Sequence, residues 1–126
     1  MRSILTERRA ADRKAMAKAL TELGATLGAT VTIEPIGSYE ISLKIEHPSG
    51  LCVYISLDGK TPHARPNTFV LPWHMDGHPE AKLARSFGTV NPHHQRKATH
   101  VVEGWPALHA EIKRGLAAAN DGSAFE

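Results

Sequence analysis

The sequence is poor in the residues that would cross-link the chain or anchor it in a membrane. Its 126 residues include a single cysteine, Cys52, so no disulfide can form within the chain. No apolar run approaches the ~20 residues that cross a bilayer, and no apolar stretch of a secretory signal follows the basic start. A lone cysteine is typical of a reducing compartment. The sequence therefore predicts a cytoplasmic protein with no membrane partner. We expect it to be of bacterial or phage type, and its Ala- and Arg-rich composition suggests a GC-rich genome.

The sequence also lacks a strong charge of one sign and the motif of a common cofactor. Its net charge of +2 with neutral histidines is too small to indicate nucleic-acid binding by itself. The glycine-rich residues 24–37 do not end in the Lys-Ser/Thr of a phosphate loop, and they lead into a strand pattern rather than a helix. We therefore expect no cofactor.

Two segments have the composition and spacing of amphipathic helices. Residues 5–24 are rich in helix-forming residues, with Thr6 suited to the N-cap and Gly24 to the stop. Their apolar stripe is confined to the second half and consists of Met16, Ala19, Leu20 and Leu23. The first half should therefore project into solvent or meet a partner. The second helix is expected over residues 106–119, with a stripe of Leu108, Ile112, Leu116 and Ala119 and a stop at residues 120–122.

Alternating apolar and polar residues predict a hairpin between the helices. The first strand of the hairpin, residues 39–46, would turn Tyr39, Ile41, Leu43 and Ile45 inward. The second, residues 51–57, would turn Leu51, Val53, Ile55 and Leu57 inward. Residues 29–34 form a preceding strand that ends in a turn at residues 35–37. Residues 68–75 form a following strand with Phe69, Leu71, Trp73 and Met75 on one face. Pro72 cannot donate a ladder hydrogen bond, so this strand is expected at an edge or a bulge.

These elements predict one α+β domain over residues 1–126. An N-terminal helix is followed by an antiparallel meander of four or five strands and a C-terminal helix, with both helices packed on one face of the sheet. Residues 79–88 allow two interpretations. Pro79 and Gly88 would frame a short helix, whereas Leu83, Arg85 and Phe87 alternate as in a strand, and we favour the strand. A short strand over residues 99–102 precedes the last helix.

The stretch "LPWHMDGHPE" contains the candidate metal ligands. On a helix, His74 and His78 would share one face, but the flanking prolines and glycine argue against a helix. At a strand end, His74 and Asp76 would lie ~6.6 Å apart on one face, which suits two ligands of one metal. The alternative is a solvated strand end followed by an Asp-Gly turn, and we favour that interpretation. A metal-dependent hydrolase built on His74 and Asp76 is the weakest of the functional hypotheses.

Basic residues gather in two parts of the chain and form the candidate anion or nucleic-acid site. One part is the N-terminal helix. The other is residues 82–100, which contain Lys82, Arg85 and the adjacent pair Arg96 and Lys97 but no acidic residue. Such side chains bind phosphate oxygens. The candidate residues are Arg8, Arg9, Arg13, His93, His94, Arg96 and Lys97. The alternative is that these are solvated surface residues.

Cys52 is the remaining candidate for chemistry. A nucleophilic cysteine needs a base that lowers its pKa, and His47 in the neighbouring turn could lie close. No strand-to-helix elbow accompanies it, so catalysis is not favoured. The hypothesis that the sequence favours is therefore a small non-enzymatic binding protein. It would contact a protein partner, or another copy of itself, through an exposed sheet face or the charged N-terminal helix. Nucleic-acid binding is the second hypothesis.

Overall fold

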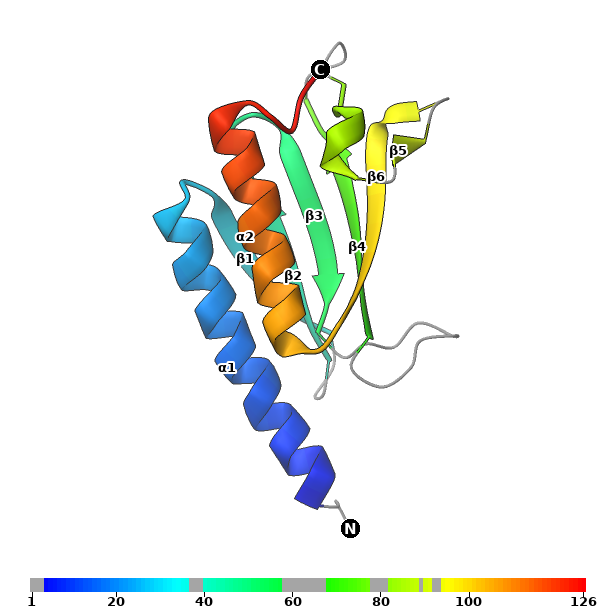
Figure 1. Cartoon of the computed structure of the whole chain (residues 1–126). Helices are drawn as coiled ribbons and strands as arrows, with labels where there is room; N and C mark the ends of the chain where they lie inside the picture. Colours follow the sequence, from blue (N-terminus) through cyan, green and yellow to red (C-terminus); the bar gives the residue numbers. More distant parts are fainter. Residues whose placement is uncertain (1–3, 37–39, 58–67, 78–81, 89, 92–93) are drawn as a thin grey trace.

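The computed structural model describes residues 4–36, 40–57, 68–77, 82–88, 90–91 and 94–126, which form two helices and one sheet. The elements in chain order are α1 (Ile4–Thr26), β1 (Thr30–Ile36), β2 (Glu40–Glu46), β3 (Leu51–Ser56), β4 (Thr68–Met75), the 3₁₀ turn η1 (Arg85–Phe87), β5 (Val90–Asn91), β6 (His94–Glu103) and α2 (Trp105–Asp121). The strand order is β1-β2-β3-β4-β6-β5, and all neighbours are antiparallel. Both helices lie on one face of the sheet (Figure 1). The predicted fold class is confirmed.

The core lies between this sheet face and the helices. The inward residues predicted for residues 68–75 are all buried, and so are those predicted for residues 51–57. Leu20 of α1 and the α2 residues Leu108, Ile112 and Leu116 complete the core from the helix side. The predicted stripe of the second helix is confirmed. No described helix is long and apolar enough to span a membrane.

Gly24 was expected to end the first helix, and this prediction is wrong. The helix runs to Thr26, and Gly28, with φ of 80°, makes the turn into β1. Gly24 lies inside α1 because β1 passes close to it, so that an added Cβ would meet the Val31 side chain. The glycine therefore sets the distance between α1 and β1 rather than the end of the helix.

Both proline predictions in the strands need correction. The turn expected at residues 35–37 begins later, because Pro35 still pairs with Ile41 as part of β1. Residues 37–39 lie outside the described residues. Pro72 marks neither an edge nor a bulge, since β4 lies between β3 and β6 and its register with β6 runs without a shift through Pro72 opposite Thr99.

The position of Pro72 follows from the direction of the β4 backbone. The Asp76 N–H donates to Gly50 O at 2.8 Å, so the even-numbered residues of β4 direct their backbone groups toward β3. The β3–β4 register is Leu51–Met75 and Cys52–His74 and stops there, before it would reach Pro72. At Pro72, therefore, β4 forms no backbone hydrogen bonds with β3, and the N–H that proline lacks is not needed there.

The strand favoured within residues 79–88 is also wrong for the part that the structure describes. Residues 85–87 form η1, and Leu83 makes only an isolated bridge to Phe125. Phe87 is turned into the core, where its ring meets Trp73 edge to face at 5.6 Å between centroids. Leu83, ahead of the 3₁₀ turn, and Phe87, at its end, are both buried, so two inward side chains account for the apolar character that resembled a strand.

Helix α2 is held close to β4. An added Cβ on Gly115 would overlap the Trp73 ring, so the glycine allows α2 to pack directly on the indole. At the start of α2, the Trp105 ring lies 4.8 Å from the Phe69 ring, measured between centroids. Both tryptophans therefore attach α2 to the inner face of the sheet.

Candidate functional site

The outer face of the sheet carries exposed apolar side chains. In β6, Val101 is 62% exposed and lies opposite Val70 of β4. Pro72 is exposed two residues further along β4, and Tyr54 of the neighbouring β3 is 39% exposed. We call Tyr54, Val70, Pro72 and Val101 the outer patch. The two helices pack against the opposite face, so among the described elements no helix covers the outer patch (Figure 1).

Polar side chains lie on the same face beside the outer patch. Tyr54 donates a hydrogen bond from its hydroxyl to Glu34 Oε2 on β1, and this bond raises the pKa of the phenol. Lys44 forms a 2.8 Å ion pair with Glu46, which raises the pKa of the lysine. The bond to Glu34 holds the Tyr54 hydroxyl toward β1. The patch is therefore an apolar area beside an ordered polar one.

Cys52, the candidate nucleophile, is a buried thiol. It is 4% exposed, lies between Glu46 and His74 of the adjacent strands, and donates from Sγ to Gly50 O at 3.4 Å. Burial, with smaller contributions from nearby acidic groups, raises the pKa of the thiol. A raised pKa is the reverse of what a nucleophilic cysteine needs.

His47, the base considered for Cys52, is engaged elsewhere. Its Nδ1 lies 2.7 Å from Ser49 Oγ, and its Nε2 lies 2.7 Å from Asn120 Oδ1. The Asn120 amide donates in turn to Leu27 O at 2.9 Å. His47 therefore links the β2–β3 turn to the ends of both helices, and we assign it a structural role.

The candidate metal ligands lie at the end of β4. His74 is half-buried, with Nδ1 3.2 Å from Pro72 O, and Asp76 is exposed. His78 lies outside the described residues. Within the part of the chain that the structure describes, no group of three His, Cys, Asp or Glu side chains could hold a metal ion. The pair His74 and Asp76 would need ligands from elsewhere.

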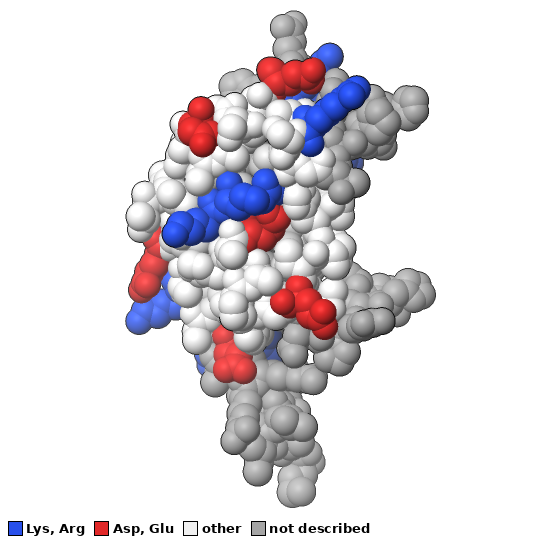
Figure 2. Space-filling view, in the orientation of Figure 1, with Lys and Arg blue, Asp and Glu red and all other residues white. Residues whose placement is uncertain are grey.

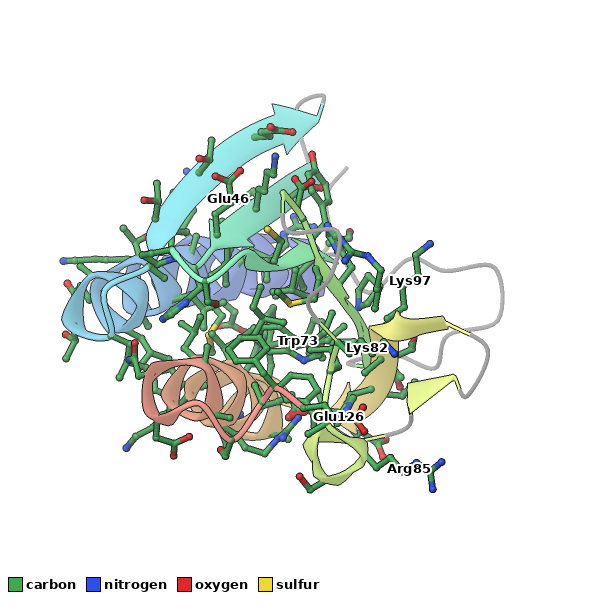
Figure 3. All side chains as sticks on the ribbon, turned by 90° about the horizontal axis from the view of Figure 1, so that it is seen from above. Glu46, Trp73, Lys82, Arg85, Lys97 and Glu126 are labelled. Atoms are coloured by element: carbon green, nitrogen blue, oxygen red, sulfur yellow. The ribbon has the colours of Figure 1, made fainter. Side chains whose placement is uncertain are left out.

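The basic residues of the predicted anion site are distributed over different surfaces where they can be followed. Arg96 directs its guanidinium to Met75 O at 3.2 Å, whereas Lys97 is exposed on the next position of β6. The labelled Lys82, Arg85 and Lys97 side chains extend in different directions in Figure 3. On the helix face, basic and acidic side chains are interspersed (Figure 2). Arg13 lies on α1, whereas the side chains of Arg8, Arg9 and His94, and all of His93, lie outside the described part. The anion site stays a prediction.

A buried carboxylate that was not predicted from the sequence lies between α2 and β6. Glu111 is 7% exposed; its Oε2 lies 2.9 Å from His100 Nδ1, and its Oε1 accepts a hydrogen bond from Arg114 Nε. Arg114 also stacks on Phe87, with 4.7 Å from its guanidinium carbon to the ring centroid. Glu111 lies three residues after Leu108 and so shares the inner face of α2 with it. This position among apolar residues was the feature of the sequence that could have indicated a buried carboxylate.

A histidine oriented by a carboxylate is a familiar arrangement for general-base catalysis, but this one is closed. His100 Nε2 is buried, and a Cβ on Gly88 would overlap the His100 ring. The backbone at Gly88, directly after η1, thus covers the nitrogen that would have to meet a substrate. We therefore assign the Glu111 cluster to anchoring η1 and β6 on α2.

A groove runs between α1 and the β1–β2 edge of the sheet. Its volume is about 470 Å³, and its lining residues are Lys14, Ala17, Lys18, Thr21, Glu22, Ile33 and Ile41. Ile33 of β1 is 47% exposed in the groove. We call this the α1–β1 groove.

Comparison with known proteins gives no match: no protein-family model, no curated protein and no solved structure corresponds to this chain. The case for a function therefore comes from the chain's own surfaces, the outer patch and the α1–β1 groove.

Proposed function

We propose that the protein is a small non-enzymatic binding protein that acts by protein–protein contact through the outer face of its sheet. The observation that supports this most is the outer patch, in which Val101 is 62% exposed on a strand face that no described helix covers. Isolated surface hydrophobics are ordinary in monomeric proteins. Here, however, apolar side chains adjoin one another on three neighbouring strands, and such grouped exposure is typical of interaction sites.

The chemistry of the outer patch fits a protein partner better than a nucleic acid. Val70, Pro72 and Val101 offer no donor to a phosphate, and Tyr54 already gives its hydroxyl hydrogen to Glu34. Phosphate binding needs basic side chains or backbone N–H groups directed at one place. Protein interfaces instead favour an apolar centre with aromatic side chains and a polar rim. Lys97 and Thr99, both exposed on β6, would belong to that rim.

Photo-crosslinking tests the proposed function. A photoreactive phenylalanine analogue is placed at Val101, or at the exposed Lys113 of α2 on the opposite face as a control, and each protein is irradiated in cells of the source organism. We expect a covalent protein adduct of defined mass from position 101 and none from position 113. No adduct at position 101, or the same adduct from both positions, would refute the proposal. An adduct removed by nuclease would replace it with nucleic-acid binding.

A further inference from the structure

Among the described strands, β1 stands at the end of the strand order and therefore has a neighbouring strand on one side only. The direction of its backbone groups follows from β2. The Leu57 N–H donates to Ile41 O at 2.9 Å, so odd-numbered residues of β2 face β3 and even-numbered residues face β1. Because Lys44 lies opposite Thr32, the even-numbered residues of β1 bond to β2. The odd-numbered residues of β1 therefore direct their backbone groups to the free edge.

The free edge has a defined set of hydrogen-bonding groups. Val31 and Ile33 each offer an N–H and a C=O, whereas Pro35 offers only a C=O because proline has no N–H. An edge strand with unpaired groups is a template on which another extended segment can pair. The two donors of β1 therefore set where such a segment can bind.

The α1–β1 groove lies directly beside these groups. Ile33 contributes its backbone to the free edge and its side chain to the groove, where it meets α1 residues of the Lys14–Glu22 face. An added strand would direct every second side chain to the helix side of the sheet, because side chains alternate along a strand. Those side chains would enter an apolar groove whose deeper lining includes Ala17 and Ile41.

The charges around the groove indicate the chemistry of the occupant. Lys14, Lys18 and Glu22 lie on one face of α1 at helical spacings of four residues, and all three are exposed. Glu22 can neutralise Lys18, its neighbour one turn away, so that among the described lining residues Lys14 is left as the excess positive charge. A carboxylate on the occupant would complement that excess.

From these observations we propose that β1 and the α1–β1 groove bind an extended segment of a partner protein as an additional strand. Its backbone pairs with Val31 and Ile33, its alternate apolar side chains enter the groove, and an acidic side chain lies near Lys14 and Lys18. This mode of recognition combines main-chain hydrogen bonds with side-chain pockets. The site is separate from the outer patch, and either surface can bind without the other.

Selection from a library of random displayed peptides against the full chain tests this inference. We expect enriched peptides to alternate apolar residues and to carry Asp or Glu. A selected peptide should bind more than about tenfold more weakly to Ile33→Lys and to the double variant Lys14→Glu/Lys18→Glu. Lys113→Glu, a charge reversal on exposed α2 surface, is the matched control and should leave the affinity unchanged. Thermal melting checks that each variant folds.

Two further measurements distinguish strand addition from simple burial of side chains. Methylating the peptide amides that face Val31 and Ile33 should abolish binding, whereas methylating the alternate amides should not. A repeated selection on the Lys14→Glu/Lys18→Glu variant should enrich basic peptides. The inference is overturned if no peptide is enriched, if binding ignores Ile33→Lys, or if the free chain self-associates through β1. None of these outcomes depends on crosslinking at Val101, so the proposed function is tested separately.

Discussion

The packing of α2 on the sheet makes a prediction whose sign depends on two opposing effects. Gly115 is inside a helix, where replacement by alanine ordinarily stabilises a protein by about 1 kcal/mol. At this position, however, the new Cβ would overlap the Trp73 ring. Trp73 is 1% exposed and is packed edge to face on Phe87, so its ring has little room to move.

The magnitudes decide the outcome. Overpacking a well-packed core costs about 1–3 kcal/mol, which equals or exceeds the gain in helix propensity. Gly115→Ala should therefore lower the free energy of unfolding by about 0–2 kcal/mol, the difference between the two effects. Trp73→Phe removes the benzo-ring atoms that the Cβ would meet. In that background, Gly115→Ala should instead stabilise the protein by about 1 kcal/mol.

Urea unfolding of the four proteins, wild type, both single variants and the double variant, measures the coupling between the two positions. We expect a coupling of about 1–3 kcal/mol, equal to the overpacking cost. The contradicting outcome is that Gly115→Ala stabilises the wild-type protein as much as it stabilises the Trp73→Phe variant. That result would mean that α2 does not lie on the indole.

Further predictions concern the buried carboxylate, the thiol and the edge strand. Glu111→Gln removes the negative charge that His100 and Arg114 contact. The free energy of unfolding measured in urea should therefore fall by about 1–3 kcal/mol, and an unchanged value would contradict the role assigned to Glu111. Burial raises the pKa of the Cys52 thiol in the folded protein, so the thiol ionises at a lower pH in the unfolded chain than in the folded one. The free energy of unfolding should therefore decline as the pH rises above ~8.5, the ordinary pKa of a cysteine. Cys52→Ala should remove that part of the decline, and an identical pH profile would contradict the assignment. In amide hydrogen exchange, Val31 and Ile33 should exchange faster than Thr32, whose N–H faces β2, and equal protection would contradict the free edge.

Much of the fold could be predicted because its signals are local. The alternation through Leu43 and Ile45, and through Val53 and Ile55, requires one buried sheet face whatever the rest of the chain does. The stripe of α2 similarly requires a helix with one side on the core. Two helical stripes and one apolar sheet face are enough to place both helices on the same side.

Features that depend on distant partners could not be predicted. Pro72 was expected at an edge or a bulge, but it is tolerated inside the sheet because the register with β3 stops before reaching it. Gly24 resembled a helix stop, but its small size serves the contact with Val31. In both cases the residue type was correctly recognised as special, and its reason lies on another strand.

The same distinction applies to the candidate sites. Glu111 sits among apolar positions of α2, and the sequence does not state that His100 and Arg114 meet it. The α1–β1 groove combines residues from α1 with Ile33 and Ile41, so it exists only once the helix is placed on the sheet. The exposed sheet face, by contrast, was expected from the polar phase of the strands and the number of helices.

Both interaction proposals depend on one claim, that Ile33 and Val101 are uncovered in the free protein. Methyl NMR relaxation in the presence of a soluble paramagnetic agent tests this claim most directly, with Ile45 and Val53, both 0% exposed, as controls of the same residue types. We predict strong enhancement for the methyl groups of Ile33 and Val101 and little for those of Ile45 and Val53. Equal protection of all four would contradict the account, because another segment or another copy of the chain would then already cover both surfaces.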